Sequence, residues 1–247
     1  MLSQLNIKGV MCTSFQGGME QNGGIWDFHA RNHVVEEGDD MSKEENDRES
    51  VDFHQAAEQG DANSQYRLGQ AYIFGRGVPI DSKLAMSWFQ KAAEQGHCRA
   101  MYKMGQVYKY GQQDDQQAAT SYRKAADLGH ACSQYMLAEM YANGEGVQED
   151  FQQAYHWYRQ AAEHGSSEAQ YKMGLAYESG HGAPQDDRQA YAWFYVAVAN
   201  GFYSVSKDRD EVAKRLPSAD LVQAQALATR YLDQYQVRKR LRGVAHA

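Results

Sequence analysis

The chain has 247 residues, a formal net charge of −7 and a mean hydropathy of −0.75. An acidic balance argues against a nucleic-acid-binding protein, because nucleic acids favour a basic surface. No apolar run approaches the roughly 20 residues that a membrane-spanning helix needs. The three cysteines leave one thiol unpaired under any pairing, so we expect a reducing compartment, the cytoplasm, and no membrane insertion.

Residues 1–40 are rich in glycine and show no apolar periodicity, so we expect a disordered or non-native N-terminal extension there. One hypothesis is that the genuine start is Met41, because residues 36–40 can be encoded by a purine-rich run that would serve a bacterial gene as a ribosome-binding site. His29 and His33 lie four residues apart, but no H-E-x-x-H pattern and no helical context accompany them. We therefore predict no metal site and no cofactor.

Residues 36–52 contain nine acidic and two basic residues, so this segment carries the whole excess of negative charge. Behind it, residues 53–60 (FHQAAEQG) match the closing stretch of the repeats that follow. The end of a helical array exposes an apolar face unless a further helix covers it. We therefore predict that residues 41–60 form a degenerate N-terminal capping helix.

From residue 61 onward one pattern occurs four times, each time as a helix, a glycine turn, a second helix and a closing glycine. Its Tyr-x-[Leu/Met] element recurs at steps of 36, 33 and 36 residues, counted between Tyr66, Tyr102, Tyr135 and Tyr171. A period in this range predicts an α-helical solenoid. The predicted repeats are 61–96, 97–129, 130–165 and 166–201.

The first helix of each repeat carries one apolar face, which Leu68, Ala71 and Tyr72 represent in the first repeat at helical spacing. Glycine follows the Leu/Met position in three repeats, and alanine does so in the third. A mid-helix glycine costs about 1 kcal/mol relative to alanine. We expect these glycines where a neighbouring backbone comes too close for a Cβ: Gly69, Gly105 and Gly174.

The second helix follows the pattern A-x-x-W-[YF]-x-x-A-A, which places its apolar residues on one face. An aspartate precedes each of these helices as a predicted N-cap, and a closing glycine in the left-handed conformation is expected after each. The second repeat is three residues short: it keeps Gly111 but lacks the Gly-Val-Pro turn, and Ser121 replaces the tryptophan. The predicted caps are Asp81, Asp114, Asp150 and Asp186, and the closing glycines are Gly96, Gly129, Gly165 and Gly201.

The element LGxxYxxGxGVxxDxxxAxxWYxKAAExG, at residues 68–96 and 137–165, resembles the Sel1-like repeat family. The resemblance covers about residues 53–201. It implies an all-α fold, a right-handed α/α solenoid similar to tetratricopeptide repeats, with helical caps at its ends. It also implies an adaptor that binds other proteins. A secreted branch of the family has a disulfide in each repeat, which this chain lacks, so the hydrolase activity of that branch is not carried over.

After the repeats, residues 202–236 predict C-terminal capping helices, at 208–216 and 219–235, and residues 237–247 predict a basic frayed tail. The paired glycines between helices are expected to serve turn geometry rather than to hold phosphate. Cys98 and Cys132 are expected to be buried small residues rather than a reactive pair. His97 and His130 are expected to be polar surface residues.

The strongest candidate for binding is a second stripe on the first helices, which by analogy with tetratricopeptide repeats would line a concave groove. Tyrosine is enriched at binding hot spots, although these tyrosines could instead pack between adjacent helices. The basic residues beside them favour an acidic partner. The predicted protein-binding residues are Tyr66, Arg67, Gln70, Phe74, Tyr102, Lys103, Gln106, Tyr110, Tyr135, Glu139, Tyr171 and Lys172.

We therefore predict a non-enzymatic bacterial scaffold or adaptor whose partner is another protein or a peptide. One alternative is a dedicated inhibitor or immunity-type protein that binds a single toxin or enzyme. A second alternative is a hydrolase with a site assembled between repeats, although no nucleophile–base–carboxylate motif supports it.

Overall fold

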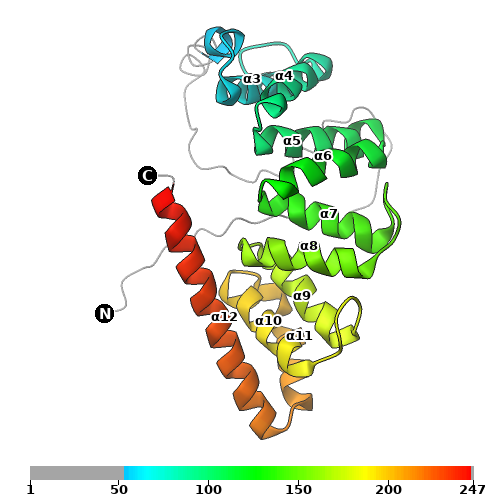
Figure 1. The fold of residues 1–247 in the computed structure, drawn as a ribbon, viewed down its shortest axis with the longest axis vertical. Helices are drawn as coiled ribbons and strands as arrows, with labels where there is room; N and C mark the ends of the chain where they lie inside the picture. Colours follow the sequence, from blue (N-terminus) through cyan, green and yellow to red (C-terminus); the bar gives the residue numbers. More distant parts are fainter. Residues whose placement is uncertain (1–52, 246–247) are drawn as a thin grey trace. The chain divides into compact units, whose positions relative to one another are not determined.

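The computed structural model describes residues 53–245, which are helical or form the turns between helices and contain no strand (Figure 1). The described residues form two compact units. The N-terminal unit comprises residues 53–133 with the turn residues 145–147, and the C-terminal unit comprises residues 134–144 and 148–245. The expectations for residues 1–40, Met41, His29 and His33 lie outside the described residues. All-α architecture is confirmed for the described part of the chain.

The N-terminal unit consists of two helical hairpins that follow a short helical stretch at residues 53–58. Leu68 and Phe89 are fully buried in it, and Trp88 is nearly so, because the apolar positions predicted from helical spacing face one another across each hairpin. The helices are α3 (Ala62–Phe74), α4 (Ser82–Glu94), α5 (Cys98–Gln106) and α6 (Asp115–Asp127).

The shortened second repeat replaces its turn with a π-helix, η1 (Val107–Gln112), that continues directly from α5. Gly111 lies inside η1, whereas Gln113 adopts the left-handed conformation, with φ 55°, that glycine takes in the other turns. Gly111 is therefore not the turn glycine of this repeat. Because this repeat is three residues shorter than the others, the chain must reverse its direction at the end of α5. The wider turn of the π-helix makes this reversal possible.

The C-terminal unit contains two further hairpins and two capping helices. Its fully buried side chains include Leu137, Met173 and Phe194. Figure 1 shows α12 as one long helix beside α10. The elements are α7 (Ala131–Asn143, from Gln134 onward in this unit), α8 (Phe151–Glu163), α9 (Ser167–Ser179), α10 (Asp187–Ala199), η2 (Tyr203–Val205), α11 (Ser206–Arg215) and α12 (Ser218–Ala245).

The predicted helix caps are confirmed. Each of the four aspartates accepts a hydrogen bond from a backbone N–H of the first turn, as Asp81 does from Lys83 and Leu84 at 2.9 and 3.0 Å. Such a cap satisfies N–H groups that have no partner inside the helix. The four closing glycines all have positive φ, between 81° and 101°.

The mid-helix glycines make room for an aromatic ring, not for a neighbouring backbone, so that part of the prediction was wrong. A Cβ at Gly69, Gly105 or Gly174 would lie 2.3–2.6 Å from a ring carbon of the aromatic residue on the second helix of the same repeat. These rings are Phe89, Tyr122 and Phe194. Ring burial within the hairpin therefore compensates for the poor helix propensity of glycine.

Helix α12 packs along α10. The rings of Trp193 and Tyr231 stack at 4.7 Å, and the Tyr231 hydroxyl donates to Gln189 Oε1 at 2.7 Å. The helix runs on through Ala245, so residues 237–245, which were expected to form a frayed tail, are helical.

Candidate protein-binding face

Most of the site residues predicted for the N-terminal unit lie at least partly in solvent. Arg67 is exposed, and the side chains of Phe74 and Tyr110 are 39% and 40% exposed. By contrast, Tyr66 is only 7% exposed and belongs to the core. The predicted stripe is thus partly a packing surface.

Residues from α3 and α5 surround one small hollow of about 10 Å³. Its wall contains four predicted site residues: Gln70 and Phe74 from α3, and Lys103 and Gln106 from α5. Ile73, Phe89 and Val107 also line it. We define the α3–α5 face as Arg67, Gln70, Phe74, Tyr102, Lys103 and Gln106.

Three polar residues of the α3–α5 face, all on α5, are joined by hydrogen bonds. Lys103 Nζ donates to Gln106 Oε1 at 3.2 Å, and Gln106 Nε2 donates to the Tyr102 hydroxyl at 3.0 Å. A chain of this kind holds side chains in one arrangement before a partner arrives, which lowers the entropy lost on binding.

Each repeat tyrosine of this unit lies between a ring of the second helix and the histidine that follows the closing glycine. Tyr66 stacks on His97 at 4.7 Å, and Tyr102 lies 5.0 Å from His130 and 5.8 Å from Tyr122. Packing between helices therefore accounts for much of the tyrosine pattern. The hydroxyl of the fully buried Tyr122 has no hydrogen-bond partner among the described residues.

The two histidines begin the first helix of the next repeat and are half-buried, so the expectation of plain surface residues was wrong. His97 Nδ1 accepts a hydrogen bond from the Ala100 N–H at 3.1 Å, and His130 Nδ1 accepts one from the Ser133 N–H at 3.3 Å. Burial, and then the charges of Arg99 and Lys103, lower the pKa of His130 to about 4. The neutral imidazole is therefore a helix cap in both repeats.

This cap predicts an acid-sensitive stability. Because the pKa of His130 is below its ordinary 6.5 in the folded chain, the stabilisation is present above pH 6.5 and is lost as the pH falls from 6.5 toward 4. The loss amounts to roughly 3 kcal/mol at most. The free energy of unfolding is measured with urea at pH 7 and at pH 4.5. It should fall less between these pH values for His130→Asn than for the wild type, because asparagine keeps a capping acceptor but does not titrate. An equal loss of stability between pH 7 and pH 4.5 in the wild type and in His130→Asn would exclude this role for His130.

In the C-terminal unit the structure brings together Glu139 and Lys172, both predicted site residues. Lys172 Nζ lies 2.8 Å from Glu139 Oε1, and the Tyr158 hydroxyl donates to the same oxygen. Burial, and then the charge of Glu139, raise the pKa of Tyr158 far above its ordinary value. Tyr158 is the [YF] position of the A-x-x-W-[YF] pattern, which predicted only that it lies on the apolar face of its helix, and nothing in that spacing indicated that its hydroxyl would reach Glu139.

The two predicted tyrosines of this unit are packing residues to different degrees. Tyr135 is 2% exposed and lies 5.9 Å from Tyr158. Tyr171 is half-buried, with Phe194 and Phe202 each 5.6 Å away. Burial, and then the nearby Asp208 carboxylate, raise the pKa of Tyr171. Since Tyr135 is enclosed, it is a poor candidate for contact with a partner.

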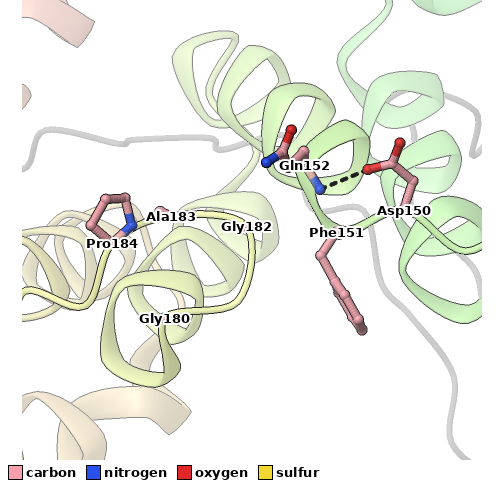
Figure 2. A pocket seen from close by; sticks show the side chains of 7 residues that line it. All are labelled: Asp150, Phe151, Gln152, Gly180, Gly182, Ala183 and Pro184. Atoms are coloured by element: carbon pink, nitrogen blue, oxygen red, sulfur yellow. Dashed lines mark hydrogen bonds between the residues drawn. The ribbon is translucent and has the colours of Figure 1, made fainter.

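A larger open hollow, of about 500 Å³, lies where the turn between α9 and α10 meets the start of α8 (Figure 2). Its one charged residue is Asp150, which accepts the hydrogen bond from Gln152 N at 2.9 Å that caps α8. Phe151 is 42% exposed and stacks on His181 at 5.3 Å. The carboxylate is already used as a cap, so the hollow contains no set of residues for acid–base catalysis.

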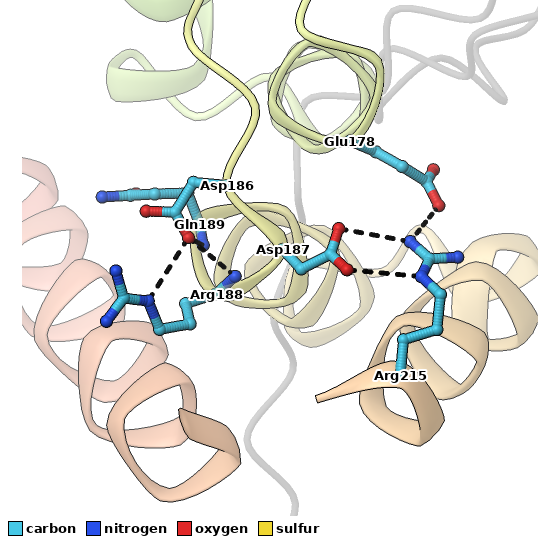
Figure 3. Close-up of polar contacts among 6 residues, drawn as sticks. All are labelled: Glu178, Asp186, Asp187, Arg188, Gln189 and Arg215. Atoms are coloured by element: carbon cyan, nitrogen blue, oxygen red, sulfur yellow. Dashed lines mark hydrogen bonds and ion pairs between the residues drawn. The ribbon is translucent and has the colours of Figure 1, made fainter. Parts of the chain in front are cut away.

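Ion pairs fasten the C-terminal cap to the last repeat (Figure 3). Arg215 at the end of α11 lies 2.6 Å from Glu178 on α9 and 3.3 Å from Asp187 on α10. Arg188 donates to Asp186 on one side and, at 3.2 Å, to Gln223 on α12. These groups are structural, and of them the sequence identified only Asp186, as a helix cap.

Several kinds of site are absent from the described part of the chain. Residues 53–245 contain no group of three His, Cys, Asp or Glu side chains that could hold a metal ion. No helix among them is both long enough and apolar enough to cross a membrane. Cys98 is a free, half-buried thiol, so it is not paired with Cys132.

Comparison with known proteins identifies the repeats. The model of the Sel1 repeat family matches residues 62–97, 98–130, 133–166 and 167–202, more than half of the chain. A search of curated proteins found no match.

Two solved structures are similar in fold and sequence. The first is a protective antigen of uropathogenic Escherichia coli strains with a Sel1-like-repeat fold: identity is 35%, the TM-score is 0.69, and the alignment covers 75% of this chain but 41% of the antigen. The second is a Sel1 repeat protein from Oxalobacter formigenes, with 25% identity, a TM-score of 0.62, and coverage of 76% and 85%. This chain thus spans less than half the length of the antigen.

An immunity protein from Pseudomonas aeruginosa also aligns, with 19% identity, a TM-score of 0.46, and coverage of 86% of this chain and 80% of that protein. A likeness at this level supports no inference about function or partner. Sel1 repeat proteins generally mediate protein–protein interactions and are typically non-enzymatic. By its four matched repeats and its fold, the chain belongs to the Sel1 repeat family.

Proposed function

We propose that this protein is a non-enzymatic adaptor that binds a partner protein or peptide on the α3–α5 face. The observation that carries the proposal is that Gln70, Phe74, Lys103 and Gln106, from two consecutive repeats, surround one hollow. A surface built from two repeats can contact a longer stretch of a partner than a single helix can.

The composition of this face suits a binding site. Phe74 is 39% exposed with the Arg76 guanidinium 5.2 Å from its ring centre, and Arg67 is exposed on the same helix. Aromatic residues and arginine contribute a large share of binding energy at protein interfaces. Lys103 and Arg67 favour an acidic partner, because opposite charges speed association and select against basic partners.

The Phe74→Ser and Lys103→Ala double variant tests this face. Proteins captured from native lysate by the wild-type chain are identified by mass spectrometry, and the affinity of the purified partner is then measured by calorimetry. We expect the double variant to bind that partner at least tenfold more weakly, because it loses an aromatic anchor and a cation.

The matched control is Leu84→Ser with Lys124→Ala, which removes an exposed apolar residue and a lysine from α4 and α6. It should bind like the wild type. If the wild type and both variants bind the partner with equal affinity, then the binding site is not the α3–α5 face. A single stoichiometric partner would favour the inhibitor or immunity-type form of this function, and several partners would favour a hub. Cell fractionation would test the proposed location in the bacterial cytoplasm.

A further inference from the structure

The hollow of about 500 Å³ at the start of α8 contains a carboxylate whose second oxygen is unused (Figure 2). Asp150 Oδ1 accepts both cap hydrogen bonds, from the N–H groups of Gln152 and Gln153 at 2.9 and 3.0 Å. Within residues 53–245, Asp150 Oδ2 accepts no hydrogen bond and no cation pairs with the carboxylate. Because Asp150 is exposed, its Oδ2 is open to a hydrogen-bond donor of another molecule.

The equivalent aspartate of the last repeat has a cation from its own chain (Figure 3). The Arg188 guanidinium lies 3.4 Å from the Asp186 carboxylate, and Arg188 stands two residues after this cap. In the third repeat the same position is occupied by Gln152, which carries no charge. The start of α8 therefore has the carboxylate of this arrangement without its guanidinium.

Phe151 adds an exposed aromatic side chain to the same hollow. Its side chain is 42% exposed, and the His181 ring lies 5.3 Å away with 20° between the two ring planes. A guanidinium group stacks on aromatic faces, and its planar fork of N–H donors matches a carboxylate. An arginine side chain therefore suits both groups. The residues that stand at the position of Phe151 in the other repeats are Ser82, Asp115 and Asp187.

The charges around the hollow favour a cation over an anion. The N-terminus of a helix attracts anions through its free N–H groups, but in α8 the Asp150 carboxylate already accepts hydrogen bonds from two of these groups. Glu149, directly before this cap, is exposed and pairs with no cation of residues 53–245. The segments 148–153 and 180–185 contain these two acids and no lysine or arginine. Electrostatic complementarity therefore selects a basic ligand.

We propose that this hollow binds an arginine-containing segment of a partner protein. The guanidinium pairs with the Asp150 carboxylate and lies against the Phe151 ring, and an apolar residue next to the arginine packs on Pro184, which is exposed in the wall of the hollow. The site belongs to the C-terminal unit and does not depend on the α3–α5 face. It selects a basic segment, whereas that face favours an acidic one.

The test titrates the ¹⁵N-labelled full-length protein with the synthetic peptide acetyl-Gly-Arg-Leu-Arg-Leu-Gly-amide and follows the backbone amide signals by NMR at low salt. We expect the signals of residues 149–153 and 180–183 to shift and to saturate. The same peptide with glutamate in place of both arginines should leave these signals unchanged.

The variant Asp150→Asn removes the charge but keeps a capping side chain. It should bind the arginine peptide about fivefold more weakly, because an exposed ion pair contributes an effect of this size. Phe151→Gln should weaken binding about threefold through loss of the ring. The matched control is Asp81→Asn, which removes the same charge from the equivalent cap of the first repeat and should bind the peptide like the wild type.

Three results would overturn the proposal. The first is the absence of saturable shifts at these residues in the wild type. The second is an equal loss of affinity in Asp150→Asn and Asp81→Asn, which would mean that the peptide responds only to the net charge of the chain. The third is a shift of the same signals with protein concentration in the absence of peptide, which would identify a second copy of the chain as the occupant. None of these results bears on the α3–α5 face, because that face lies in the N-terminal unit.

Discussion

Gly182→Ala is expected to lower the free energy of unfolding by about 4 kcal/mol. Gly182 has φ 81°, where an L-residue costs about 1–2 kcal/mol. A Cβ there would also lie 2.3 Å from the backbone carbonyl oxygen of Phe151. The turn or the start of α8 must therefore shift, and such overpacking typically costs another 1–3 kcal/mol. Urea unfolding followed by circular dichroism measures the loss.

The same turn offers a matched control in Gly180→Ala. Gly180 also has positive φ, 78°, but the nearest atom to its Cβ position would be 3.6 Å away, an ordinary contact. This variant should lose only about 1–2 kcal/mol, from backbone conformation alone. If the two variants unfold at the same urea concentration, then close packing of the turn against α8 does not stabilise the unit.

Gly174→Ala is expected to destabilise the C-terminal unit by about 2 kcal/mol, although alanine is the better helix former by about 1 kcal/mol. Its Cβ would lie 2.3 Å from Cε1 of Phe194, a ring that is fully buried. Displacing a buried ring disturbs the packing around it. Phe194→Leu should remove the conflict, so that Gly174→Ala in that background is neutral or stabilising in the same unfolding assay.

The third repeat supplies the reverse exchange. Ala138 stands at the equivalent position and is fully buried in the same hairpin as Tyr158. Ala138→Gly should lose about 1 kcal/mol, from helix propensity. Gly174→Ala and Ala138→Gly should therefore both destabilise the chain. A gain in stability from Gly174→Ala would contradict the steric role of the glycine.

The helical hairpins could be predicted in detail because their signals are local. An aspartate placed before a helix, as Asp81 is, accepts hydrogen bonds from residues two and three positions along the chain. A closing glycine such as Gly96 adopts positive φ because it has no Cβ, which is a property of that residue alone. Repetition of these local signals at steps of 33 to 36 residues also indicated the family.

The second repeat shows the limit of that approach. Its missing residues were evident from the sequence, and Gly111 was the natural choice for the turn. The structure instead widens the helix end into η1 and places Gln113 in the left-handed conformation. Which residue absorbs a deletion depends on how both flanking helices pack, and a local pattern does not contain that information.

The candidate site was only partly predictable for a similar reason. Helical spacing placed Tyr66, Phe74 and Tyr135 among the predicted binding residues, yet Phe74 is exposed whereas Tyr66 and Tyr135 are buried. Their exposure depends on residues outside their own helix: His97 stacks on Tyr66, and Tyr158 lies beside Tyr135.

The amino-acid sequence by itself determined the repeat, the helices, their caps and the excess of acid ahead of residue 53, since each of these depends on neighbours in the chain or on a simple count. The tertiary structure decided which tyrosines are enclosed, that aromatic rings oppose the mid-helix glycines, and that Arg67 lies over the ring of Phe53. Those outcomes depend on side chains that meet across helices some 14 to 31 residues apart. Periodicity places a residue on a helix face, but only the packed neighbours determine what that face contacts.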